Sequence, residues 1–232
     1  MRTRILVSFV VLAAFVIGSG ASAQTASERV ETIKAILDAS KQALHEYQWI
    51  ETETISLNGE QKAQKVSRCY YGPDGKVQKM VISQTAPPEK KRGLRGAIQE
   101  KEEDELKQYM QQAAELVHSY VPPDPVKLLA SQQAGNVTIQ PQPNQGVKVT
   151  FANYLKQGDS IAIDVDLVDN RLQNATVSSY IGDSQNNAIT LQANWSVLAP
   201  SGISYVQSAT LNAPAKNLSV TVSNSDYTKV MQ

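Results

Sequence analysis

The chain has 232 residues, in which 22 lysines and arginines are balanced by 22 aspartates and glutamates. A formal net charge of zero provides no positive field, which argues against nucleic acid as a partner. Cys69 is the single cysteine, so an intrachain disulfide is excluded. Its position beside Tyr70 and Tyr71 predicts a small buried side chain rather than a nucleophile.

The first 23 residues have the pattern of a cleavable export signal. Arg2 and Arg4 give a basic start, residues 5–17 form an almost unbroken apolar run, and small residues precede the expected cleavage after Ala23. The run is shorter than the about 20 apolar residues that a membrane-spanning helix needs, and no later segment approaches that length. The sequence therefore predicts a periplasmic or secreted protein that does not span a membrane, with residues 24–232 as its mature part.

Helical spacing of apolar residues predicts an amphipathic helix over residues 27–47. The period then changes to that of β-structure, and Asn58-Gly59 is a strong signal for a two-residue hairpin turn. The expected strands are 48–57, 60–71 and 76–84.

The middle of the chain changes from strand to helix after Pro87-Pro88, which ends the first group of strands. The basic stretch 90–96 is expected to be a solvated connector, because the acidic run 100–105 offsets its charge. One apolar stripe predicts an amphipathic helix over 98–120, and a second, short helix is expected over 126–130.

The C-terminal part is poor in charge and rich in Asn, Gln, Ser, Thr and Val, and it predicts about seven antiparallel strands between Asn136 and Ser223. No strand alternates with a long crossover helix, so the fold class is α+β. We expect one domain over 24–232, with a large curved antiparallel sheet (an incomplete barrel) and amphipathic helices on its concave face. The alternative is an α+β domain over 24–130 followed by a β-sandwich over 131–232.

Few residues suggest catalysis. His45 and His118 are the only histidines, and neither belongs to a zinc-binding or nucleophile motif. Asp164 and Asp166 point to the same side of one predicted strand, which indicates a solvated strand face rather than a calcium site. No catalytic residue, metal or cofactor is expected.

The order of elements is similar to that of the periplasmic lipoprotein-carrier family, the LolA and LolB kind. An export signal, an N-terminal amphipathic helix leading into a hairpin, a middle amphipathic helix and about ten antiparallel strands carry this resemblance. It implies an incomplete barrel lined with apolar side chains and covered by helices, with a cavity that accepts acyl chains. Arg68, flanked by Val66 and Tyr70, is the nearest candidate for the functional arginine of that family, and the role is not transferred to it.

The first functional hypothesis is an exported, non-enzymatic binding or carrier-like protein for an acyl chain or other hydrophobic small molecule. A helix with Met and Ala on an aromatic-poor sheet favours loose packing and therefore a cavity. Its expected lining is Trp49, Ile55, Leu106, Met110, Leu116, Val117 and Trp195. An alternative is an envelope module whose C-terminal sheet binds a protein or glycan partner, and a hydrolase of unknown type comes third.

Overall fold

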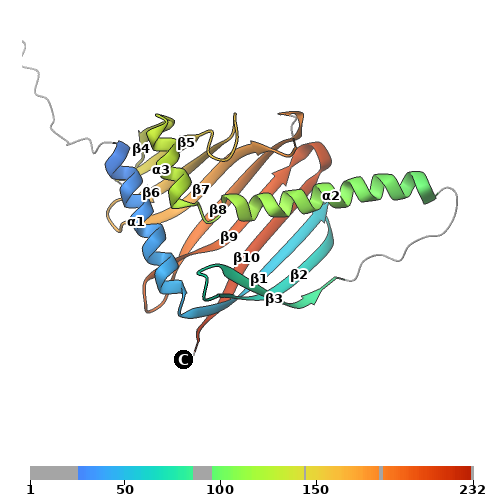
Figure 1. Ribbon diagram of the computed structural model, residues 1–232, viewed down its shortest axis with the longest axis horizontal. Helices are drawn as coiled ribbons and strands as arrows, with labels where there is room; N and C mark the ends of the chain where they lie inside the picture. The colour runs from blue at the N-terminus through green and yellow to red at the C-terminus, as the bar shows by residue number, and fades with distance from the viewer. Residues whose placement is uncertain (1–25, 86–95, 144, 183–184, 231–232) are drawn as a thin grey trace, which may run out of the picture.

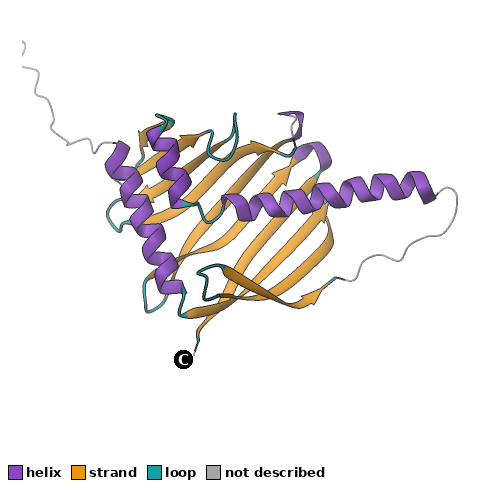
Figure 2. Ribbon diagram, in the orientation of Figure 1, coloured by secondary structure: helices purple, strands orange, loops and turns teal. Residues whose placement is uncertain are grey.

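The computed structural model describes residues 26–85, 96–143, 145–182 and 185–230 of the chain. The predicted export signal and most of the basic connector lie outside these residues. In the described ranges the chain forms three α-helices and one ten-stranded sheet (Figures 1 and 2).

The helices are α1 (Ala26–Leu44), α2 (Gly96–Tyr120) and α3 (Pro125–Gln133). All three helices were expected. α1 ends at Leu44, before the predicted end at residue 47, because the next element, strand β1, already begins at Tyr47. The start of α3 has a clear local cause. The Asp124 carboxylate accepts a hydrogen bond from the Val126 backbone N–H, and Pro125 occupies the first turn, where no N–H is needed.

The first three strands are β1 (Tyr47–Leu57), β2 (Glu60–Tyr71) and β3 (Val77–Gln84). Asn58 and Gly59 connect β1 to β2 with φ angles of 52° and 79°. Positive φ at both central residues is the geometry of the turn that the sequence predicted. All three strands lie within a residue of their expected positions.

Seven further strands follow α3, as expected. They are β4 (Val137–Pro141), β5 (Gly146–Ala152), β6 (Ser160–Asp166), β7 (Arg171–Tyr180), β8 (Ala188–Leu198), β9 (Ile203–Ala213) and β10 (Leu218–Lys229). Short 3-10 segments, η1 (Gln185–Asn187) and η2 (Pro214–Lys216), lie between the later strands. The last strand extends six residues beyond the predicted limit at Ser223.

The sheet has the order β3-β2-β1-β10-β9-β8-β7-β6-β5-β4, and every neighbouring pair is antiparallel. The first strand of the chain pairs with the last, with Thr54 opposite Thr221. Strands β3 and β4 are the two edges, so the sheet remains open. This confirms the predicted α+β fold, and it shows that β4 to β10 continue the sheet of β1 to β3. The boundaries of the single domain stay a prediction.

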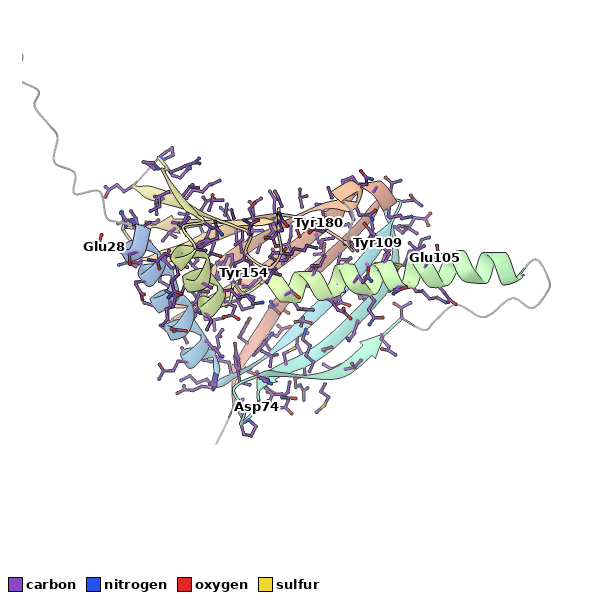
Figure 3. The ribbon with its side chains drawn as sticks, turned by 45° about the horizontal axis from the view of Figure 1, so that its top comes forward. Glu28, Asp74, Glu105, Tyr109, Tyr154 and Tyr180 are labelled. Carbon is purple, nitrogen blue, oxygen red and sulfur yellow. The ribbon has the colours of Figure 1, made fainter. Side chains whose placement is uncertain are left out.

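The helices lie across one face of the curved sheet (Figure 1). α1 buries Val30, Ile33, Leu37 and Leu44, the four residues whose spacing predicted this helix. The C-terminal part of α2 lies on β9 and β10, whereas its N-terminal part extends past the sheet (Figures 1 and 3). The helix layer therefore covers the sheet unevenly.

Candidate ligand cavity

A cavity of about 250 Å³ lies between the helices and the sheet. Its walls come from the C-terminal ends of α1 and α2 and from strands β1, β2, β3, β8, β9 and β10. Apolar lining residues include Leu37, Leu44, Val121, Val206, Ala209 and Val222. This composition is typical of sites for apolar or amphiphilic small molecules.

Three of the seven predicted lining residues line this cavity, namely Trp49, Val117 and Trp195. Ile55 and Met110 line an adjoining groove of about 410 Å³ beneath α2. Leu116 lines a separate hollow of about 230 Å³ near Ile181, and Leu106 is half-buried on α2 without lining any of these three spaces. The structure therefore distributes the predicted set over several places.

Aromatic rings form one wall of the cavity. The Trp49 ring stacks on Tyr227 with centroids 5.6 Å apart and an interplanar angle of 14°, and it lies 5.7 Å from the Tyr71 ring. Tyr205 continues the wall, with its ring 4.6 Å from that of Tyr227. None of these three tyrosines was predicted from the sequence as a lining residue, since Tyr205 and Tyr227 reach Trp49 only through the pairing of β1 with β10 and β10 with β9.

The Trp49 side chain is fixed by hydrogen bonds as well as by stacking. Its indole N–H donates to the Asn224 side-chain oxygen at 3.1 Å, and the Asn224 amide donates to the Val206 backbone carbonyl at 2.9 Å. Burial raises the pKa of Tyr71 and of Tyr227, so both phenols remain neutral. The wall is a preorganised, uncharged surface.

A charged cluster separates the cavity from the groove beneath α2, because Lys79 and His118 line both spaces. The Lys79 ammonium lies 2.6 Å from a Glu51 carboxylate oxygen and 3.2 Å from His118 Nε2. His118 Nε2 also lies 3.4 Å from a Glu53 carboxylate oxygen. The hydrogen bond from His118 lowers the pKa of Glu53, against the opposing effect of burial.

Cys69 is fully buried on β2, as its neighbours predicted. Burial, reinforced by the nearby Glu51 carboxylate, raises the pKa of its thiol to about 12. A thiol with this pKa stays protonated near neutral pH. The predicted burial of Cys69 is therefore confirmed.

The acidic residues of β6 contact neighbouring protein groups. Asp164 lies 3.5 Å from the Lys148 ammonium, and Asp166 accepts hydrogen bonds from the backbone N–H groups of Val168 and Asp169. Among the described residues, no group of three or more His, Cys, Asp or Glu side chains is arranged to hold a metal ion.

Arg68 lies on the other face of the sheet from the cavity. It is exposed, between Ser67 and Cys69, which are buried on the helix-covered side. Its partner across the β2–β3 ladder is Met80, which is also exposed. Arg68 is therefore not positioned to contact the cavity.

The end of α2 that closes the cavity is tied to the opposite half of the sheet. The Tyr120 and Tyr154 rings lie 5.9 Å apart, and the Tyr154 hydroxyl accepts a hydrogen bond from the Asp124 backbone N–H at 2.7 Å. Figure 3 shows Tyr154 beside this end of the helix.

Asp74, in the β2–β3 turn, lies near the end of α1, where the His45 ring stacks on Tyr71 with centroids 4.4 Å apart.

The alternative hypothesis, an interaction module, requires a binding surface on the C-terminal sheet, and the outward face of β8 is one candidate for it. Thr190, Gln192 and Asn194 form an exposed polar row there. Such a row is equally expected of any solvated strand face. Binding of a protein or glycan by this surface stays a prediction.

Comparisons with protein families and with curated proteins give no match. Among solved structures, the chain is similar to a DUF1329 family protein from Desulfovibrio piger, with a TM-score of 0.44 and 11% identity over 86% of this chain and 92% of that chain. It is also similar to a LolA superfamily protein from Nitrosomonas europaea, with a TM-score of 0.34 and 9% identity over 86% of this chain and 94% of that chain. Likenesses of this degree assign no function.

No helix in the described part of the chain combines the length and the apolar character needed to cross a bilayer.

Proposed function

We propose that this chain is an exported, non-enzymatic carrier-like protein that holds one hydrophobic or amphiphilic small molecule in the cavity between its helices and its sheet. The observation that carries the proposal is an apolar space of about 250 Å³ walled by Trp49, Tyr71 and Tyr227. The export is supported by the N-terminal sequence pattern alone.

The size of the cavity limits the class of ligand. Pockets for drug-sized ligands usually measure about 300–1,000 Å³, so a space of about 250 Å³ suits a single acyl chain or a small apolar molecule. A lipid with several chains would need a larger opening between α1 and α2. The proposed ligand therefore has one chain.

The chemistry of the lining favours binding over catalysis. Cys69 is buried and protonated outside the lining, and the His118 ring in the lining is held by Lys79 and Glu53. Among the described residues no serine or cysteine is hydrogen-bonded to either histidine, as nucleophilic catalysis of the triad kind would require. Retention of a hydrophobic ligand needs an apolar wall and no reactive group.

Binding of an uncharged fluorescent probe, N-phenylnaphthylamine, tests this proposal. We expect the wild-type protein to enhance probe emission in a saturable manner. Ala209→Leu should weaken the binding at least about tenfold, because Ala209 lines the cavity and the larger side chain fills it. Gln192→Leu is the matched control, since Gln192 is exposed on the outward face of β8.

Two outcomes would contradict the proposal. One is a wild-type protein that neither binds the probe nor carries lipid by native mass spectrometry after purification. The other is equal probe affinity in the wild-type and Ala209→Leu proteins, which would place the bound probe elsewhere.

A further inference from the structure

The charged groups that line the cavity include a cation without a counter-ion. Lys41, Lys79 and Glu51 line it, and the Lys79 ammonium already lies 2.6 Å from the Glu51 carboxylate. The Lys41 ammonium forms no hydrogen bond or ion pair with any residue that the structure describes. The cavity lining therefore has one positive charge left over at its exposed rim, in the last turn of α1.

A buried hydroxyl in the same cavity also lacks a partner. Ser204 is 8% exposed, and its Oγ forms no hydrogen bond in the described part of the chain. A buried hydroxyl without a hydrogen bond is costly, so a water molecule or a ligand that bonds to it would be stabilising. Ser204 is the second residue of β9, the strand that α1 contacts most. Lys41 and Ser204 both line the cavity, the first from α1 and the second from β9.

We propose that the natural ligand of this cavity is a single-chain amphiphile with an acidic head group. The acidic head accepts hydrogen bonds from the Lys41 ammonium and the Ser204 hydroxyl, and the chain lies along Trp49 and Val117. This inference rests on the proposed function and adds the chemistry of the head group to it.

A cationic head group fits the same site less well. Its charge would meet Lys41, while the carboxylate in the cavity, Glu51, is already held by Lys79. Stacking on Tyr227 also covers one face of the Trp49 ring, which leaves less of that ring for a cation–π contact. Charge and hydrogen bonding both favour an anion.

The test compares three ligands with the same dodecyl chain: laurate, dodecanol and dodecyltrimethylammonium. Binding to the full mature chain is measured below the micellar concentrations at fixed ionic strength, from tryptophan fluorescence and by calorimetry. We expect laurate to bind at least about tenfold more tightly than dodecanol, because charge-assisted hydrogen bonds are the strong ones. The cationic ligand should bind most weakly.

Two variants locate the head group. Lys41→Gln should remove most of the preference for laurate over dodecanol, whereas Lys216→Gln, an exposed lysine on η2, should leave it unchanged. Ser204→Ala should also weaken laurate binding, yet the melting temperature of its ligand-free form should stay equal or rise, since an unsatisfied hydroxyl is removed. Ser179→Ala is the contrast, because Ser179 is buried with its hydroxyl bonded to Tyr120, and its loss should lower the melting temperature.

The possible results separate this inference from the proposed function. Equal affinity for laurate and dodecanol, or tighter binding of the ammonium ligand, would overturn the acidic head group and leave the cavity function standing. A preference for laurate that survives both Lys41→Gln and Ser204→Ala would overturn its assignment to these residues. Failure of all three ligands to bind would overturn the proposed function and this inference together.

Discussion

The Tyr120 hydroxyl donates a hydrogen bond of 2.6 Å to the Asp159 carboxylate, and the same Tyr120 hydroxyl lies 2.7 Å from the Ser179 hydroxyl. The same Asp159 oxygen accepts the backbone N–H groups of Leu155 and Lys156. Asp159 and Tyr120 are both buried. The last residue of α2 is thereby fixed to the turn that precedes β6. These hydrogen bonds hold the C-terminal end of α2, which lines the cavity, in place.

Tyr120→Phe should reduce the free energy of unfolding by about 2 kcal/mol, since it removes a buried hydrogen bond to a charged group and leaves Ser179 without its partner. Urea denaturation followed by circular dichroism measures this loss. Tyr180→Phe is the control, because the Tyr180 hydroxyl bonds to the Gln157 carbonyl in an exposed position. A loss that is equal in the two variants would contradict the assigned role of Tyr120.

The Cys69 thiol should resist modification in the folded protein. With its pKa at about 12, only about one thiol in ten thousand is ionised at pH 8, and the side chain is fully buried. Ellman's reagent should therefore label Cys69 slowly in buffer and rapidly in urea, where the pKa returns to about 8.5. Rapid labelling of the native protein would show that β2 is accessible at this position.

The contribution of Glu53 to stability should depend on pH. The pKa of Glu53 is lowered in the folded state by His118. The ionised Glu53 side chain therefore stabilises the fold fully at pH values above its pKa in the unfolded chain, about 4.3. This stabilisation is lost as the pH falls through the lower pKa that Glu53 has in the folded protein. The difference in unfolding free energy between wild type and Glu53→Gln should thus be largest above about pH 5 and shrink on acidification.

Glu60→Gln provides the comparison for this pH series. Glu60 also has a lowered pKa, because Lys62 bonds to it, but this pair is on the surface. Salt should suppress the pH-dependent effect of Glu60→Gln and should largely spare that of Glu53→Gln, whose side chain is only 15% exposed. A pH series in which both effects vanish with salt would refute a shielded position for Glu53.

The cavity predicts losses of stability of different size for the same substitution at two buried alanines. Ala209 lines the cavity, whereas Ala175 is fully buried in the core and does not line it. Ala209→Leu should change the unfolding free energy by less than about 1 kcal/mol, because the added methyl groups enter empty space. Ala175→Leu should cost about 1–3 kcal/mol through overpacking. Equal losses in thermal or urea denaturation would indicate that the space beside Ala209 is filled.

The sequence predicted the elements well because their signals are local. The apolar stripe of α1 predicted its buried face, and Asn58-Gly59 predicted the first hairpin, since both depend on residues within one or two turns of chain. The seven strands after α3 followed from alternation and turn residues in the same way.

The cavity was harder to predict because it depends on pairing between distant strands. Nothing in the local pattern places Tyr227 of β10 against Trp49 of β1, so the aromatic wall was missed. The sequence predicts Leu106, Met110, Leu116 and Val117 as lining residues of one cavity, yet the helix that holds them extends beyond the sheet near Glu105 (Figure 3). Met110 consequently borders the open groove, and Leu106 lines none of the three spaces.

The pairing of β1 with β10 also affects how the chain is made. β1 to β3 and β4 to β9 can each form as successive hairpins, but the ladder that joins them, with Ile55 opposite Val220, needs the last strand to be synthesised. Because β10 contributes Val222, Asn224 and Tyr227 to the cavity, a nascent chain without β10 lacks part of the cavity wall. The cavity is thereby incomplete until β10 has been synthesised and has paired with β1.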